Sequence, residues 1–290
     1  MSDEASEHVY LNGKIIPKGK AFISPFDRGF MYGDGFFETT RIEDDRPLQF
    51  DRHFERIARS CRRTGWEWEP DGKIVRAACK ELILRNEVET GYLRLTISRG
   101  QTGGLMDLQA VEPTVLIVAK PMELSPLDDS PAWILARAKG KVPADSITIG
   151  LKSASYQENL LNLAEGRRRG ADEVYFLNTR NEIAECSISN IFVVDRGVLK
   201  TPSENCGLLP GIARQTILEI CAQQKMPCEA VRLDEESLCR GEEVFCSNSL
   251  RGVIPVKQLL DPELREVSDC VVTARLQKEY ARVAREESYI

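Results

Sequence analysis

The order of hydrophobic and polar residues divides the first part of the chain into strand-like and helix-like segments. Residues 9–16 place an Asn-Gly pair between apolar stretches, a pattern typical of a β-hairpin. Apolar and polar residues alternate over 92–98, whereas 113–119 is short and almost wholly apolar, so both are predicted strands. Apolar residues at spacings of three and four predict helices over 51–65 and 73–86. A further strand is expected at 36–42, just before an acidic turn.

The second half of the chain continues this mixture of the two kinds of element. Predicted strands cover residues 132–138, 146–152, 173–177, 182–184, 189–195 and 244–247. Predicted helices cover residues 155–169, 210–225 and 262–286. Because strands and helices mix without strict alternation, the predicted fold class is mixed α/β, or α+β.

A proline-rich stretch marks the predicted boundary between two domains. Residues 120–131 contain Pro121, Pro126 and Pro131 together with acidic residues, a composition typical of a connection rather than of a strand or helix. We therefore expect a smaller N-terminal α/β domain at 1–120, a connection at 121–131 and a larger C-terminal domain at 132–290.

Composition narrows the classes of protein to which the chain can belong. The 290 residues carry a formal net charge of -6, so the overall basic surface expected of a nucleic-acid-binding protein is absent. No apolar run reaches the length of a membrane span, and the acidic first residues do not resemble a signal peptide. The nine cysteines form no Cys-x-x-Cys pair, which favours reduced thiols and a cytoplasmic location. The only histidines, His8 and His53, have no neighbours at metal-ligand spacing, so no metal site is expected.

Several common catalytic motifs are missing from the sequence. It contains no Gly-x-Gly-x-x-Gly after a strand, no Gly-x-x-x-x-Gly-Lys-Ser/Thr loop and no Gly-x-Ser-x-Gly turn. With two histidines and no serine motif that points to either, lysine is the remaining candidate for a covalent nucleophile.

Lys152 and Glu185 stand out as residues that could carry chemistry. Lys152 ends the predicted apolar strand 146–152, where half-burial would lower its pKa and free the amine for imine formation. A surface lysine at a strand end is the plainer interpretation. Glu185 lies among small and apolar residues, and a partly buried carboxylate needs a cationic partner. A protonated pyridine nitrogen or an ordinary salt bridge would supply that partner.

Two other segments have the composition of anion sites. Residues 207–214 place Pro210 and Gly211 just before a predicted helix, where backbone N–H groups and the helix dipole attract a phosphate. Residues 245–252 run from a strand into a polar turn whose hydroxyl groups could bond a phosphate. Many helices and turns have these features without binding an anion, so both interpretations stay open for each segment.

Taken together, the order, wording and spacing of these segments resemble the class IV, or fold-type IV, enzymes that use pyridoxal 5′-phosphate (PLP). The family includes branched-chain and D-amino acid aminotransferases and aminodeoxychorismate lyase. The most specific stretch is 185–192, which matches the family's Glu-x-x-x-x-Asn-hydrophobic-Phe signature, with Lys152 upstream at a suitable distance. The resemblance extends from Tyr10 to Val256. It implies a two-domain fold similar to D-amino acid aminotransferase, with PLP as the cofactor and an active site at a homodimer interface.

The resemblance also implies roles for individual residues. Lys152 resembles the lysine that carries PLP as a Schiff base, and Glu185 resembles the glutamate that keeps the pyridine nitrogen protonated. Arg52 resembles an arginine that binds the phosphate, since its planar charged fork suits that group. Tyr156 resembles a tyrosine near the ring hydroxyl, although its spacing from Lys152 is one residue shorter than in typical branched-chain aminotransferases. The other implied cofactor contacts are Leu209 on the ring, and Ile212, Ala213 and Ser249 at the phosphate.

Short sequence segments distinguish the reactions within the family. Residues 33–35 read Gly-Asp-Gly, as in lyases and D-amino acid aminotransferases, and Thr39 aligns with a threonine implicated in the lyase site. The segments 98–100 and 247–252 also resemble the lyase, whereas 92–94 resembles the Tyr-x-Arg of branched-chain enzymes. These features favour a lyase that converts 4-amino-4-deoxychorismate to 4-aminobenzoate and pyruvate, with Lys152 and Thr39 catalytic. Candidate substrate residues are Tyr32, Arg94, Arg99 and Arg251.

Two alternatives stay open after the sequence is read. The first is an aminotransferase that acts on branched-chain or D-amino acids with 2-oxoglutarate, and the second is a binding protein that keeps the fold without catalysis. In each case the expected partner is a small amino compound. The sequence does not settle the side chain or the stereochemistry of that compound.

Overall fold

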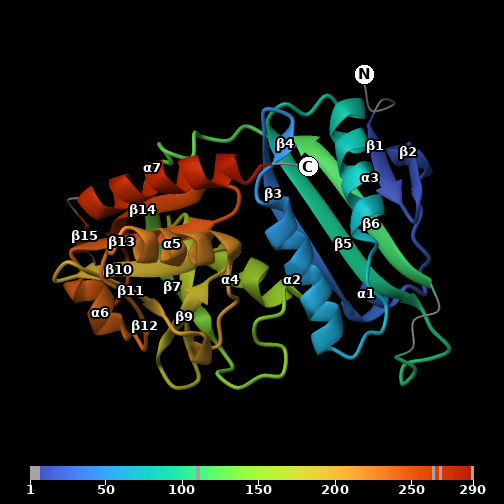
Figure 1. Ribbon diagram of the computed structural model, residues 1–290. Coiled ribbons are helices and arrows are strands. Elements are labelled where there is room, and N and C mark those ends of the chain that lie inside the picture. Colours follow the sequence, from blue (N-terminus) through green and yellow to red (C-terminus); the bar gives the residue numbers. More distant parts are fainter. Residues whose placement is uncertain (1–6, 109–111, 263–264, 268–269, 289–290) are drawn as a thin grey trace. The chain divides into compact units, whose positions relative to one another are not determined.

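The computed structural model describes residues 7–108, 112–262, 265–267 and 270–288, and the chain divides into two compact units (Figure 1). The first unit contains Met1–Leu124, Leu151–Ser155 and Ala284–Ile290, and the second contains Ser125–Gly150 and Tyr156–Val283. Neither unit is continuous in sequence. Lys152 belongs by its contacts to the first unit, although it lies beyond the predicted connection 121–131.

The first unit is built on an antiparallel sheet with the strand order β2-β1-β6-β5-β3-β4. Its strands are β1 (His8–Leu11), β2 (Lys14–Pro17), β3 (Gly35–Glu43), β4 (Arg46–Pro47), β5 (Gly91–Gln101) and β6 (Glu112–Pro121). The predicted hairpin is confirmed, because β1 pairs with β2 and both turn residues have positive φ, 47° at Asn12 and 89° at Gly13. Asparagine and glycine tolerate this backbone conformation better than other residues.

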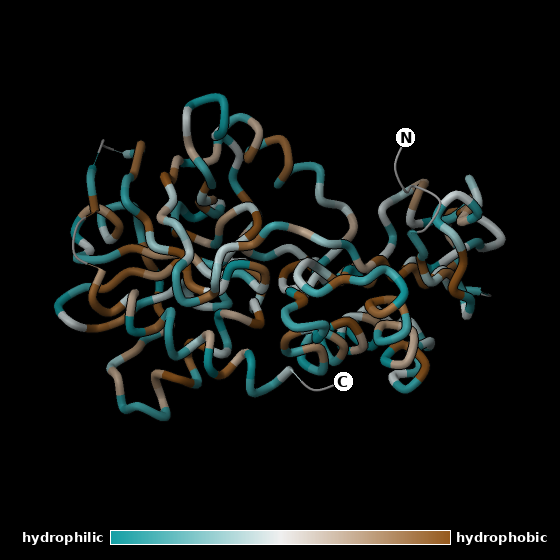
Figure 2. The backbone as a smooth tube through the Cα atoms, turned by 90° about the horizontal axis from the view of Figure 1, so that it is seen from above, coloured by the Kyte–Doolittle hydropathy of each residue, from teal (hydrophilic) through white to brown (hydrophobic). Residues whose placement is uncertain are grey.

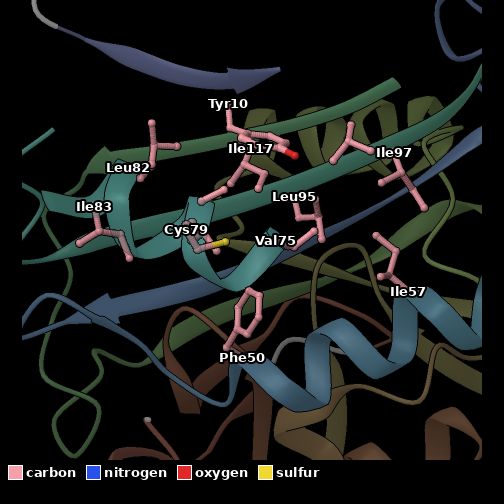
Figure 3. Close-up of a cluster of buried hydrophobic side chains, with 14 of the residues drawn as sticks. Tyr10, Phe50, Ile57, Val75, Cys79, Leu82, Ile83, Leu95, Ile97 and Ile117 are labelled. Carbon is pink, nitrogen blue, oxygen red and sulfur yellow. The ribbon is translucent and has the colours of Figure 1, made fainter. Parts of the chain in front are cut away.

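Helices cover one face of this sheet and bury its apolar side chains. The helical elements of the unit are η1 (Lys18–Lys20), α1 (Arg28–Tyr32), α2 (Phe50–Arg63) and α3 (Gly72–Arg85). Figure 3 shows Ile57 of α2 and Leu82 of α3 in the same cluster as Ile97 of β5. Each such side chain contributes about 1.5–3 kcal/mol when it is fully buried. The opposite face of β3 and β5 is therefore available for polar side chains.

The second unit contains a mixed sheet with the strand order β12-β11-β10-β13-β14-β7-β8-β9, and β15 pairs with β14. The first of its strands in sequence are β7 (Trp133–Val142), β8 (Glu173–Asn178), β9 (Ile183–Cys186), β10 (Asn190–Asp195) and β11 (Val198–Pro202). The remaining strands are β12 (Cys228–Val231), β13 (Glu243–Asn248), β14 (Gly252–Leu259) and β15 (Arg265–Glu266). Its helices are α4 (Gln157–Arg168), η2 (Glu204–Cys206), α5 (Ile212–Gln223), α6 (Glu235–Arg240) and α7 (Val271–Glu286).

The central strands of the second unit are almost fully buried. Figure 2 colours the backbone by hydropathy, and hydrophobic and hydrophilic stretches alternate along the chain. Phe192 of β10 and Phe245 of β13 stack with ring centroids 4.7 Å apart. This packing fixes the strands that carry the signature residues.

Two of the predicted elements are wrong. Residues 146–152 form a turn and not a strand, since Ile147 is 88% exposed and Gly150 has a left-handed backbone with φ 75°. Lys152 therefore does not end a strand. The last helix begins at Val271 and not at residue 262, and the short strand β15 precedes it. The parts of that prediction at 263–264 and 268–269 lie outside the described residues. Within the described chain, no helix is long and apolar enough to span a membrane.

Candidate active site

Lys152 lies beside the first residues of β3 in the first unit. The backbone N–H of Phe37 donates to the carbonyl of Lys152 (3.1 Å), and the N–H of Ala154 donates to the carbonyl of Gly35 (2.9 Å). Ser153 forms an isolated antiparallel bridge with Phe36 between them. Although the predicted strand is absent, these bonds hold the backbone of the lysine against β3.

Two cationic side chains contact the ring of Phe37. The Lys152 Nζ lies 4.6 Å from the centroid of this ring, and the Arg94 guanidinium carbon lies 3.9 Å from it. Such cation–π contacts are stabilising by about 0.5–2 kcal/mol, depending on desolvation. Thr39 and Arg94 are direct cross-strand partners in the β3–β5 register. Side chains two residues apart on a strand share a face, so Phe37 and Thr39 point the same way. The structure thus brings Lys152, Arg94 and Thr39 into one neighbourhood.

The Gly-Asp-Gly segment uses its aspartate to hold neighbouring elements. Asp34 accepts from the Nε of Arg28 at 2.8 Å and from the Nε of Arg99 at 3.2 Å. The remaining donors of Arg99 bond the carbonyls of Leu108 and Thr64, and the residue is buried. Arg99 is therefore occupied by acceptors of its own unit. Tyr32 is half-exposed at the end of α1, with the Arg28 guanidinium 5.1 Å from its ring centroid.

Arg52 is paired with a carboxylate in the structure. Its Nε and Nη2 donate to the two carboxylate oxygens of Glu287, each at 2.8 Å. Gln49 also donates to Glu287 at 2.9 Å. Burial opposes ionisation of Glu287, but these hydrogen bonds hold its pKa below the ordinary value. A phosphate at Arg52 would therefore compete with Glu287.

The next arginine of α2 belongs to a buried charge cluster. Arg56 donates to both oxygens of Glu38 at 2.7 Å, and the Nδ1 of His53 lies 2.7 Å from Glu38. Burial raises the pKa of Glu38, but the charge of Arg56 outweighs it and lowers that pKa to about 2. Burial lowers the pKa of His53 despite the carboxylate beside it. The cluster joins α2 to β3 directly behind the Phe37 face.

Glu185 of β9 lies in the second unit and contacts the segment before α5. Its Oε2 accepts from the N–H of Leu209 at 3.0 Å, and the side chain is half-buried. Asn190, at the start of β10, donates through Nδ2 to the carbonyl of Leu209 at 2.9 Å. Glu185 and Asn190, the two polar residues of the signature, therefore bind the N–H and the carbonyl of Leu209. This bonding fixes Leu209 relative to the Glu185 carboxylate.

The start of α5 has the features of a phosphate site. Gly211 is its N-cap and no side chain caps the helix, so the first N–H groups, including those of Ile212 and Ala213, can serve an anion. A Cβ on Gly211 would lie 2.2 Å from the Asn190 Oδ1, so only glycine fits there. Ser247 pairs with Asn190 across β10 and β13, and its buried Oγ has no hydrogen-bond partner in the described structure.

The chemistry of these groups fits PLP. The acidic glutamate suits a protonated pyridine nitrogen, and the uncapped helix start suits a phosphate ester. An unsatisfied buried hydroxyl costs about 1–3 kcal/mol, which a ligand oxygen nearby would offset.

The other predicted residues of the second unit lie in ordered turns. The Tyr156 hydroxyl donates to the carbonyl of Ser187 at 2.6 Å. Asn248 accepts from the N–H groups of Leu250 and Arg251 at 3.1 and 2.9 Å, which shapes the turn that carries Ser249. Among the described residues, no cluster of three or more His, Cys, Asp and Glu is arranged to hold a metal ion.

Several residues that the geometry singles out have no role predicted from the sequence. Asn190 was visible as part of the signature, and Ser247 as part of a polar turn. Phe37 carried no signal, because an aromatic residue in a strand is usually core. Its contacts with Arg94 and Lys152 join residues from three separate segments of the chain.

Comparison with known proteins agrees with the resemblance. The model of the family "Amino-transferase class IV" matches residues 35–259. Aminodeoxychorismate lyase of Bacillus subtilis is 28% identical over 87% of this chain and 86% of its own length. Branched-chain-amino-acid aminotransferase of Escherichia coli is 25% identical over 97% of this chain and 94% of its own length.

A solved structure extends the comparison to the fold. A hypothetical aminotransferase from Mycobacterium tuberculosis, in its PLP-bound form, has a TM-score of 0.82 at 23% identity. The match covers 94% of this chain and 98% of that one, so the predicted fold class is confirmed. The chain therefore belongs to the class IV aminotransferase family and is a PLP-dependent enzyme.

Proposed function

We propose that the enzyme is a lyase that converts 4-amino-4-deoxychorismate to 4-aminobenzoate and pyruvate. The observation that carries the proposal is the position of Thr39, whose register partner Arg94 shares the Phe37 ring with Lys152. The hydroxyl of a threonine near the reacting lysine could donate a hydrogen bond to the enolpyruvyl leaving group. The proposal also draws on the lyase-like wording of 33–35, 98–100 and 247–252.

Lys152 and Glu185 do the central work in this proposal. Lys152 would hold the cofactor between turnovers, and its Nζ would remove the proton from the amine-bearing carbon of the substrate. Glu185 keeps the pyridine nitrogen protonated by its negative charge. The bound cofactor supplies an electron sink for the pair left on that carbon. Aromatisation of the substrate ring drives loss of the enolpyruvyl group as pyruvate.

The remaining cofactor residues divide between phosphate and ring. Ile212 and Ala213 would bind the phosphate through their N–H groups and Ser249 through its hydroxyl. Arg52 adds a charged contact if Glu287 yields to the phosphate. Leu209 would pack on the ring, and Tyr156 would lie near the ring hydroxyl.

The substrate of the lyase carries two carboxylates, so its pocket needs cations. Arg94 is the leading candidate because it lies beside Lys152 on the Phe37 ring. Arg251, in the turn before β14, is the second candidate, and Tyr32 is a candidate for a polar contact. Arg99 is the weakest of the four, since Asp34 and two carbonyls occupy its donors.

The alternative is an aminotransferase that uses branched-chain or D-amino acids with 2-oxoglutarate. Arg94 favours it as well, because it is the arginine of the Tyr-x-Arg segment and would bind the carboxylate of any amino acid. The two reactions share the first proton removal by Lys152. They differ in the next step, because in the aminotransferase Lys152 would give the proton back and no enolpyruvyl group would leave.

One pair of assays separates the two reactions. The purified enzyme with PLP is incubated with 4-amino-4-deoxychorismate, and 4-aminobenzoate and pyruvate are measured in equal amounts if the lyase proposal holds. The same preparation is tested with L- and D-amino acids and 2-oxoglutarate. Efficient transamination without any 4-aminobenzoate would contradict the lyase and support the alternative.

We further infer that the enzyme is a cytoplasmic homodimer. Exposed apolar side chains gather along residues 22–32, where Phe22, Phe26 and Phe30 are 81%, 68% and 78% exposed. Large exposed apolar patches on a monomer mark interaction sites, and two-fold dimers are the commonest oligomers. The nine cysteines, none of them in a disulfide, support a reducing compartment. Sedimentation of a fully active 32.6 kDa species would contradict the dimer.

A further inference from the structure

Glu173, at the start of β8, is a fully buried carboxylate that no part of the proposed chemistry uses. Its Oε1 accepts from the N–H groups of Val174 (2.9 Å) and Ser187 (3.2 Å) and from the Ser187 hydroxyl. Its Oε2 accepts from the N–H of Ile188 (3.1 Å) and the hydroxyl of Ser189 (2.9 Å). Every one of these partners is neutral, so the carboxylate is held without a cation.

The residues bound by Glu173 form the turn between β9 and β10. This turn of Ser187, Ile188 and Ser189 begins just after Cys186 and ends just before Asn190, so it sets the distance between the two signature side chains. It is also closed by the N–H of Cys186, which donates to the carbonyl of Ser189 at 2.8 Å. A change in this turn would move Glu185 and Asn190, and with them the Leu209 backbone that both residues bind.

The same turn orients a third candidate residue. The carbonyl of Ser187 accepts from the Tyr156 hydroxyl at 2.6 Å and from the Asn159 Nδ2 at 2.8 Å. The N–H of Ile188 lies in the same peptide plane as this carbonyl. Because Glu173 accepts from that N–H, it fixes the direction of the Ser187 carbonyl. Tyr156 on one side of the turn and Glu185 on the other therefore depend on one carboxylate.

We propose that Glu173 is a positioning residue for the PLP ring, holding Glu185, Tyr156 and the Leu209 backbone in register through the turn of Ser187, Ile188 and Ser189. The inference rests on the proposed roles of Glu185 and Tyr156. Its physical basis is that three backbone N–H groups can only donate, and the two oxygens of Glu173 accept from all of them together with two hydroxyls.

The test compares two buried carboxylates of the same unit. Glu243 is also buried, and it accepts from the N–H groups of Val272 and Thr273, both at 2.8 Å, and from the Thr273 hydroxyl at 2.7 Å. Those bonds cap α7 and involve none of the candidate cofactor residues. Glu173→Gln and Glu243→Gln therefore remove the same charge from similar neutral donors. The measurements are the dissociation constant of PLP, the pH midpoint of the bound-cofactor absorbance, and thermal unfolding of the apoprotein.

We expect both variants to lower the unfolding temperature, but only Glu173→Gln to weaken PLP binding, by about tenfold, and to change the pH midpoint. A milder pair repeats the comparison if Glu173→Gln does not fold. Ser189→Ala removes one donor to Glu173, and Thr273→Val removes one donor to Glu243. Ser189→Ala should weaken PLP binding while Thr273→Val leaves it unchanged.

Equal PLP binding and equal pH midpoints in the two members of a pair would overturn the positioning role. The proposed function would then still stand, provided that the wild-type enzyme gives the cofactor absorbance. If the wild-type enzyme itself gives no such absorbance on titration with PLP, the proposed function and the inference both fail.

Discussion

Glu38 and Glu173 are both buried carboxylates beside candidate active-site residues, but the two units hold them in different ways. In the first unit, Arg56 and His53 surround Glu38, and the arginine charge lowers its pKa to about 2. In the second unit, five neutral donors surround Glu173, and burial raises its pKa despite them. The first carboxylate is neutralised by a charge, while the second is accommodated by oriented dipoles.

The two arrangements fail in different ways when a residue is substituted. A charge pair ties two elements together strongly, but it fails when either partner loses its charge. Neutral donors hold a carboxylate only in one geometry. An acceptor of different geometry leaves at least one of these donors without a hydrogen bond. Substitutions around Lys152 should therefore act through charge and pH, whereas those around Glu185 should act through geometry.

The largest expected effect concerns Lys152, the proposed cofactor lysine in the first unit. Lys152→Ala should abolish turnover, because no other described residue on the Phe37 ring offers an amine. Some PLP should remain bound through the phosphate contacts. Turnover is measured with whichever substrate the wild-type enzyme accepts, and Lys200→Ala, which removes only an ion pair with Asp195, is the control. Residual turnover above that of a blank reaction would show that another base is used.

Removing the charge of Glu38 tests whether this carboxylate is held by a charge pair. Glu38→Gln leaves Arg56 buried without its partner, which should lower the free energy of unfolding by about 3–5 kcal/mol. Glu81→Gln removes an exposed pair with Arg85 and should cost about 0.3–0.5 kcal/mol. Urea denaturation measures both values. Similar small losses would mean that Glu38 is not charged in the folded enzyme.

Acid provides the same test without a substitution. The pKa of Glu38 is about 2 in the folded chain against 4.5 ordinarily, so its ionised form stabilises the fold at neutral pH. The contribution, about 3 kcal/mol from that shift, is fully present above pH 4.5 and is lost as pH falls towards 2. The lowered pKa of His53 acts in the same direction below pH 6.5. Unfolding measured between pH 7 and pH 3 should show this loss in wild type, and a smaller loss in Glu38→Gln.

Arg52 also forms a charge pair, but its partner Glu287 is half-exposed, unlike the buried Glu38. Arg52→Ala should raise the dissociation constant of PLP by about 10- to 150-fold, the value of one charge-assisted bond of about 1.5–3 kcal/mol. The matched variant Glu287→Gln releases Arg52 and should not weaken binding. An unchanged titration for Arg52→Ala would remove this arginine from the site.

The smallest effect is expected at the hydroxyl that favours the lyase. Thr39→Val should lower 4-aminobenzoate formation by about tenfold, or about 1.4 kcal/mol in the barrier, with PLP binding intact. Thr40→Val is the control, since its hydroxyl points to the opposite face and bonds the Leu48 carbonyl. An equal loss of rate in both variants would attribute the effect to strand packing.

The helices and most strands could be predicted from the sequence because their apolar spacing is local. The prediction failed at 146–152, where an apolar run without a strand partner became an exposed turn. For the site, the signature predicts Glu185, and its distance from Lys152 predicts the lysine; both roles stay predictions. Phe37 and Glu173 could not be predicted, because an aromatic strand residue and a buried glutamate carry no local signal. Their roles depend on which distant donors and cations the fold brings to them.

The most direct test of the proposed site is to find the lysine that holds PLP. The enzyme is mixed with PLP, reduced with borohydride and digested, and the peptide that carries the pyridoxyl group is sequenced by mass spectrometry. We expect modification at Lys152 in the wild-type enzyme and in Glu173→Gln, and none in Lys152→Ala. Stoichiometric modification of another lysine, or none in the wild-type enzyme, would contradict the assignment of Lys152.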